Sequence, residues 1–164
     1  MLTRLIAVAG ALLLLAACSS TPDPAGGPGG PLGPGGPGGP GGPRSGPGSQ
    51  QDLASTAGDR VFFAYDRAEI STEAQQILRR QSEWLRRYPN VSVTIEGHCD
   101  ERGTREYNLA LGERRAQAVK NVLVALGIPP GRVQTISYGK ERPEIPLSDT
   151  QSYAQNRRAV TAVN

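Results

Sequence analysis

The sequence predicts one folded domain of the α/β (α+β) class, a two-layer sandwich with helices packed on one face of a mixed sheet. Strand-like and helix-like segments alternate in the order β-α-β-α-β-β across residues 51–164. The 116 residues from Ser49 to Asn164 are enough to bury a single core of modest size. Only one long apolar run exists, at the N-terminus, so the composition excludes a membrane protein with several spans.

The first half of the domain reads strand, helix, strand. Arg60–Ala64 is a short β-rich run. A helix follows with its N-cap at Ser71 or Thr72, apolar residues at helical spacing, and Pro89 as its stop. Val91–Ile95 then alternates strictly between apolar and polar residues, which is typical of a strand with one buried face.

The second half repeats the alternation and ends on a strand. A loop over Gly97–Thr104 precedes a long helix expected at Arg105–Leu126, for which Gly127 is the C-cap. The next strand is expected at Val133–Tyr138. The last, Arg158–Val163, alternates in a way that predicts an edge or paired strand.

The N-terminal segment is predicted to be a signal peptide followed by a lipid-anchoring site. Leu5–Ala17 is an apolar or small run of 13 residues, about 20 Å as a helix, which suits a signal peptide (residues 1–17) better than a membrane span. The run ends in Leu15–Cys18, which resembles a bacterial lipobox. That resemblance implies cleavage before Cys18, acylation there with about three chains, and a lipidated N-terminus at residues 18–20. By the same resemblance, Ser19 indicates outer-membrane sorting; the alternative is an ordinary secretory signal with Cys18 incidental.

Residues 21–50 are predicted to form a flexible Gly/Pro-rich tether. Nine of the 14 prolines and 13 of the 21 glycines lie between residues 22 and 48, and residues 27–44 are six Gly-Pro-Y triplets. Glycine at every third position also fits a collagen triple helix, but six triplets are short and most Y positions are glycine. A spacer is favoured because this composition cannot bury a core.

The charge distribution argues against a nucleic-acid partner. The chain has 18 basic and 15 acidic side chains, a net charge of +3. The basic residues of the domain occur as arginine pairs with acids nearby, not as one basic stripe with stacking aromatic residues.

Asp100 and Arg115 are the candidate binding pair. Asp100 lies in a glycine-bounded loop after a strand, and Arg115 lies about three turns into the following helix, so the helix can fold back and bring both to one cleft. A guanidinium binds a carboxylate and an aspartate accepts from an ammonium. The pair therefore matches a free amino-acid end such as the diaminopimelate side chain of peptidoglycan. An internal ion pair, or a solvated Arg115, is the alternative.

The stretch TIEGHCDERGTREYNLALGERRAQAVK (residues 94–120), with SYGKERP at 137–143 and NRR at 156–158, closely resembles the OmpA-like peptidoglycan-binding domain family, above all its peptidoglycan-associated lipoproteins. The resemblance covers residues 57–164 and implies a peptidoglycan ligand. It also implies secondary binding roles for Tyr65, Asp66, Thr104 and Leu111, for which capping or core packing is the alternative. The NRR match leaves a rim role and sheet-edge electrostatics equally open.

The resemblance implies a non-enzymatic outer-membrane lipoprotein, with its domain facing the periplasm, that anchors the membrane to the cell wall. It further implies the Tol–Pal system, with the propeller protein TolB and other Tol proteins as partners, and a role in envelope integrity and outer-membrane invagination at division. An anchor of another envelope machine, such as a secretion or motor apparatus, is an alternative. A peptidoglycan hydrolase is another, but it needs a positioned acid/base pair or a metal.

No cofactor or metal is expected. His98 and Cys99 precede Asp100, but metal sites need three or four ligands at recognisable spacing, and the chain has one histidine and two cysteines, of which Cys18 is expected to be acylated. Cys99 is therefore predicted to be a buried, unpaired thiol.

Overall fold

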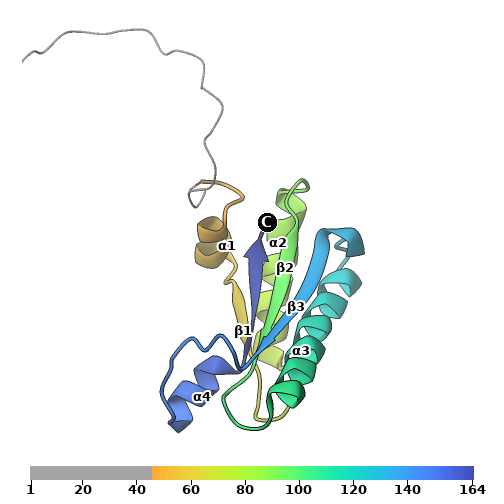
Figure 1. The fold of residues 1–164 in the computed structure, drawn as a ribbon. Coiled ribbons are helices and arrows are strands. Elements are labelled where there is room, and N and C mark those ends of the chain that lie inside the picture. Colours follow the sequence, from red (N-terminus) through yellow and green to blue (C-terminus); the bar gives the residue numbers. More distant parts are fainter. Residues whose placement is uncertain (1–45) are drawn as a thin grey trace, which may run out of the picture. The chain divides into compact units, whose positions relative to one another are not determined.

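The computed structural model of the chain describes residues 46–164 (Figure 1). The expected signal peptide, Cys18 and nearly all of the tether lie outside the described residues. The elements are α1 (Gln50–Thr56), β1 (Arg60–Phe62), α2 (Thr72–Arg87), β2 (Val93–His98), α3 (Arg105–Ala125), the 3₁₀ turn η1 (Pro130–Arg132), β3 (Val133–Gly139), α4 (Thr150–Asn156) and β4 (Arg158–Val163).

The four strands form one mixed sheet in the order β1-β4-β2-β3. β4 pairs antiparallel with both β1 and β2, whereas β2 and β3 run parallel. The C-terminal strand, expected to be an edge or paired strand, is therefore paired on both sides and lies inside the sheet (Figure 1). The parallel β2–β3 pair needs a crossover connection, and α3 supplies it.

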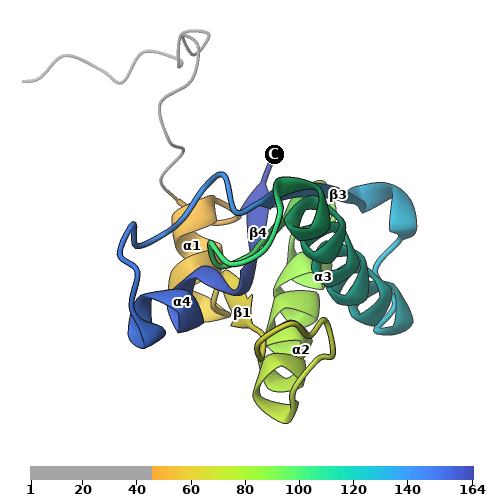
Figure 2. The ribbon, with the colours of Figure 1, turned by 60° about the horizontal axis from the view of Figure 1, so that its bottom comes forward.

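α2 and α3 lie side by side on one face of the sheet, which confirms the predicted two-layer α+β architecture (Figure 2). Both helices begin at hydroxyl caps. The Ser71 side chain accepts from the Ala74 amide, and the Thr104 side chain accepts from the Tyr107 amide. The core between the layers is apolar, with fully buried side chains such as Leu78, Leu85, Ile95, Leu123 and Val133.

β2 and α3 approach each other through glycine. A Cβ atom added to Gly97 in β2 would lie 1.9 Å from the Gly112 carbonyl oxygen in α3, so backbone meets backbone there. Gly112 lies one turn before Arg115, and Gly97 lies three residues before Asp100. This contact sets the position of the helix relative to the end of the strand, and hence of the two candidate binding residues.

Three features differ from the sequence prediction. β2 runs from Val93 to His98 and not from 91 to 95, because pairing with β3 and β4 continues past Ile95. The short helices α1 and α4 were not predicted; each begins at a capping side chain, Ser49 or Asp149. Within residues 46–164 no helix combines the length and apolar character needed to cross a membrane.

Candidate functional site

A cavity of about 300 Å³ opens where β2 ends and α3 begins. Its wall combines the β1–α2 loop, the β2–α3 loop, the first three turns of α3 and the residue between α4 and β4. The lining residues are Tyr65, Asp66, Cys99, Asp100, Arg102, Gly103, Tyr107, Asn108, Leu111, Arg115 and Arg157. Five of the six predicted binding residues therefore meet at one site.

Asp100 is a buried carboxylate, only 4% exposed, that already has cationic partners. Arg102 donates to it from Nη2 (2.6 Å), from Nε (3.2 Å) and from its backbone amide (3.2 Å). Arg157 adds a fourth bond from Nη1 at 3.3 Å. Burial by itself would raise the pKa of Asp100, but the hydrogen bonds from Arg102 and Arg157 outweigh it and hold the pKa below its ordinary value. Asp100 is thus an anion at neutral pH.

Arg115 is fully buried and connects two segments of backbone, the β1–α2 loop and the end of β2. Its guanidinium donates to the carbonyl oxygens of Arg67 (2.8 Å), His98 (2.7 Å) and Ala64 (3.2 Å). Neither alternative for this residue holds, because Arg115 is not solvated and Asp100 pairs with Arg102 and Arg157 instead. In the structure, the hydrogen bonds of Arg115 hold the backbone of the cavity wall in place.

Arg115 does not use all of its hydrogen-bond donors within the described residues. A guanidinium has five N–H groups. The three carbonyls and the Cys99 Sγ, 3.4 Å from Nη1, take four of them. One Nη2 N–H has no acceptor within residues 46–164. A two-bond contact with a ligand carboxylate, as the sequence predicts, requires Arg115 to release one present acceptor as well.

The secondary residues take different roles. Tyr65 and Asp66 line the cavity mouth, and Asp66 adopts a left-handed φ of 56°, which a non-glycine residue rarely holds. The Asp66 carboxylate accepts a hydrogen bond from the Tyr107 hydroxyl. Leu111 is a buried wall residue. Thr104 does not line the cavity; its hydroxyl caps α3.

The NRR stretch divides in the structure. Arg157 lines the cavity, reaching Asp100 while its Nε donates to the Phe63 carbonyl oxygen. The Asn156 amide instead holds the backbone of Glu144 and Ile145, which fixes the loop before α4. Arg158 is buried and lies 3.2 Å from the Glu144 carboxylate.

Sequence reasoning missed Arg102 as a residue of the site. The available signal was local: an arginine two residues after an aspartate, in a loop bounded by glycine, can turn its side chain back onto that carboxylate. Cys99 is a free, buried thiol as predicted, and burial raises its pKa. No group of three or more metal-binding side chains comes together within residues 46–164.

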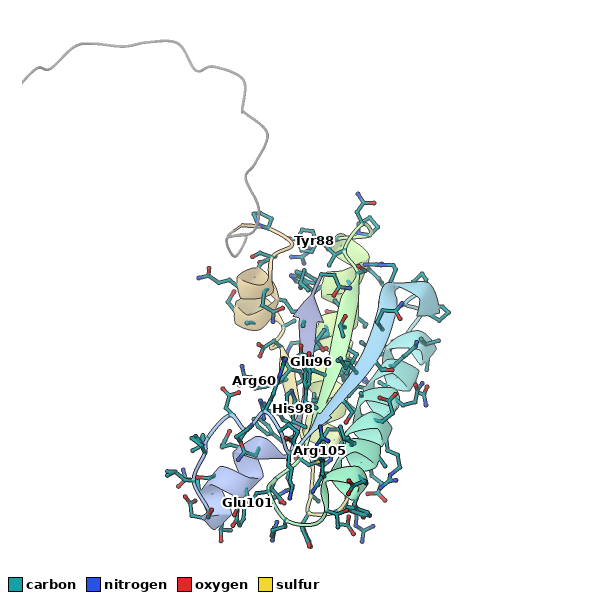
Figure 3. The ribbon with its side chains drawn as sticks, in the orientation of Figure 1. Arg60, Tyr88, Glu96, His98, Glu101 and Arg105 are labelled. Carbon is teal, nitrogen blue, oxygen red and sulfur yellow. The ribbon has the colours of Figure 1, made fainter. Side chains whose placement is uncertain are left out.

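His98, at the end of β2, is a buried imidazole in a charged environment (Figure 3). The Glu96 carboxylate lies 3.7 Å from its Nε2, and the Tyr138 ring lies tilted beside it, 5.5 Å away between ring centroids. Desolvation lowers the pKa of His98 to about 4, and the charge of Arg158 acts in the same direction, against the charge of Glu144. His98 is therefore neutral at pH 7, and its contact with Glu96 is not an ion pair there.

We expect this histidine to make the fold sensitive to acid. The folded-state pKa lies below the unfolded value of 6.5, so the stabilisation is complete above pH 6.5 and is lost as pH falls towards 4. The loss is about 3 kcal/mol over that range. Urea unfolding of the wild type and of His98→Leu at pH 7, 5.5 and 4.5 measures it, and the wild type should show the steeper decline. Parallel declines would contradict a neutral buried imidazole.

Comparison with known proteins shows to which protein family the chain belongs. The model of the OmpA family matches residues 62–157, more than half of the chain. A peptidoglycan-associated lipoprotein from Agrobacterium fabrum is 56% identical over 117 residues, which is 71% of this chain and 66% of that protein, just under two thirds of its length. One from Pasteurella multocida is 41% identical over 162 residues, covering 98% of this chain and 97% of the relative. The crystal structure of the peptidoglycan-associated lipoprotein from Burkholderia pseudomallei superposes with a TM-score of 0.63 at 39% identity, over 65% of this chain and 90% of that one.

Proposed function

Because the chain belongs to the OmpA family and is related over nearly its full length to peptidoglycan-associated lipoproteins, we propose that it binds peptidoglycan through the cavity at the end of β2. Binding is noncovalent and reversible. The family is not an enzyme family, and the domain acts as an anchor for the cell wall.

One observation carries the proposal: a single cavity presents a buried carboxylate, Asp100, and a buried guanidinium, Arg115. A ligand that displays an ammonium and a carboxylate on one carbon meets both charges at once. The free end of diaminopimelate in a peptidoglycan stem peptide has this chemistry. Leu111 supplies an apolar wall for its methylene chain, which is cheaper to desolvate than a charged group.

The anchor completes the proposed role. Acylation of Cys18 ties the chain to the outer membrane, and residues 21–50 give the domain reach to the wall. We place the protein in the Tol–Pal system, with TolB and other Tol proteins as partners and a part in envelope integrity and outer-membrane invagination at division. The near full-length relationship to peptidoglycan-associated lipoproteins supports this assignment over a secretion or motor anchor.

Co-sedimentation with purified sacculi tests the proposal. The folded domain, with only part of the tether, should sediment with sacculi and be released by a soluble diaminopimelate-containing stem peptide. The turbidity of the sacculi should stay constant, because binding breaks no bond. Failure to sediment would overturn the function, and a falling turbidity would indicate a hydrolase.

We expect Cys18→Ser to abolish lipid labelling and to release the protein from the membrane fraction. A 13-residue apolar run cannot hold a protein in a bilayer, whereas two or more acyl chains anchor it stably. Metabolic labelling with a fatty-acid analogue and fractionation of cells measure both effects. Cys99→Ser is the matched control and should leave labelling unchanged, and membrane retention of unlabelled Cys18→Ser would contradict the lipid anchor.

A further inference from the structure

The position that a ligand ammonium would take at Asp100 is already filled from within the chain. The Arg102 guanidinium forms a two-bond salt bridge with the Asp100 carboxylate, from Nη2 at 2.6 Å and from Nε at 3.2 Å. Bidentate guanidinium–carboxylate pairs are the stronger kind of ion pair. A ligand cation therefore reaches this carboxylate only in competition with Arg102.

Two tyrosine rings hold Arg102 in this place. Its guanidinium carbon lies 4.0 Å from the ring centroid of Tyr65 and 4.7 Å from that of Tyr153. Both distances fall within the range of cation–π attraction. The Tyr153 ring is itself fixed by a 2.7 Å hydrogen bond from its hydroxyl to the Glu101 carboxylate.

The Arg102 side chain can leave Asp100 without disturbing the core. It is 40% exposed to solvent, whereas the Asp100 side chain is 5% exposed and the Arg157 side chain 15% exposed. The loop backbone is held separately, since Lys140 Nζ donates to the carbonyl oxygens of Glu101 (3.1 Å) and Gly103 (2.7 Å). Arg102 can thus swing into solvent while the loop and the core stay in place.

We propose that Arg102 is an internal cation that competes with a ligand ammonium for Asp100, so that the resting site inhibits its own ligand binding. The inference rests on the proposed function and names a residue that limits the affinity of the site. Arg102 acts on binding through Asp100 and the two tyrosine rings.

The cost of displacement is the same for every ligand ammonium. Displacing Arg102 offsets part of the free energy that the ammonium gains at Asp100. A ligand with an adjoining carboxylate also engages the remaining Nη2 N–H of Arg115, which Arg102 cannot satisfy. That contact favours the second ligand with or without Arg102. Removing Arg102 should therefore raise the affinity of both kinds of ligand by the same factor.

Titration calorimetry with two stem peptides tests this. One peptide is L-Ala-D-Glu-meso-diaminopimelate, and the other carries L-lysine at the third position, which keeps the side-chain amine but lacks the second carboxylate. Arg102→Gln should bind both peptides about tenfold more tightly than the wild type. The ratio of the two affinities should stay unchanged, and the affinities of Arg102→Lys, which cannot form the two-bond pair, should fall between. Arg105→Gln is the matched control, because Arg105 is exposed, pairs with Glu141 at 3.3 Å and does not line the cavity.

The outcomes separate this inference from the function. If Arg102→Gln keeps its melting temperature but binds neither peptide more tightly than the wild type, Arg102 does not compete for Asp100, although the function stands. If the wild type binds neither peptide nor sacculi, the proposed function fails and takes this inference with it. Equal effects of Arg102→Gln and Arg105→Gln would also overturn it, since they would reflect general charge.

Discussion

Replacing Gly97 with alanine is expected to lower the free energy of unfolding by about 4 kcal/mol or more, a loss reserved for severe core defects. The added Cβ would lie 1.9 Å from the Gly112 carbonyl oxygen and 2.6 Å from its carbonyl carbon. Neither atom belongs to a side chain that can rotate away, so β2 and α3 must separate. The core side chains between the two layers would then lose packing.

Chemical denaturation of Gly97→Ala beside Gly131→Ala measures the effect. Gly131 is the matched control because a Cβ there would meet no atom within 4 Å, so its free energy of unfolding should change by at most about 0.5 kcal/mol. A Gly97→Ala protein as stable as Gly131→Ala would show that the layers do not depend on this close approach.

The glycine contact illustrates what the sequence could and could not predict. Glycine inside a helix costs about 1 kcal/mol relative to alanine, so Gly112 in the middle of α3 signals a packing reason. The sequence does not reveal that Gly97 is the residue Gly112 packs against, because Gly97 is distant in sequence and was expected to open a loop. Only the three-dimensional register of β2 against α3 pairs them.

Local chemistry explains which elements were predicted. α2 and α3 are long, follow the N-caps Ser71 and Thr104, and end near Pro89 and Gly127. The apolar periodicity and the capping residues therefore indicated the same helices. α1 and α4 have seven residues each, too few for a periodic signal, although Ser49 and Asp149 cap them. Their stability comes from tertiary contacts; Trp84 on α2, for example, donates to Asp52 on α1 at 3.0 Å.

The sequence predicted the part of the candidate site that comes from one strand-loop-helix unit. Asp100 and Arg115 belong to that unit, and both line the cavity. Arg157 enters from the junction between α4 and β4, 57 residues along the chain from Asp100, and the sequence could not show whether it reached the site. The three carbonyl partners of Arg115 were equally hidden, because backbone acceptors leave no residue-type signal.

Asp100→Ala should weaken binding to sacculi and to the diaminopimelate peptide about 30- to 1000-fold, the effect of truncating one partner of a desolvated charge pair, about 2–4 kcal/mol. Among the described residues that line the cavity, Asp100 is the only buried anion for a ligand ammonium, since Asp66 is exposed and bonded to Tyr107. Arg115→Ala should reduce affinity in the same range. It should also lower the free energy of unfolding by about 3 kcal/mol, because three carbonyl oxygens lose their donor.

Measuring affinity and stability on the same proteins separates the two roles of Arg115. Arg115→Lys should restore little of either, because an ammonium keeps the charge but cannot span acceptors on Ala64, Arg67 and His98. Arg114 is exposed, about 100° around the helix from Arg115, and is not a cavity residue, so Arg114→Ala should bind as the wild type does. If Arg114→Ala and Arg115→Ala weaken binding alike, or if added salt reproduces both, the attraction comes from diffuse surface charge and the cavity is not the binding site.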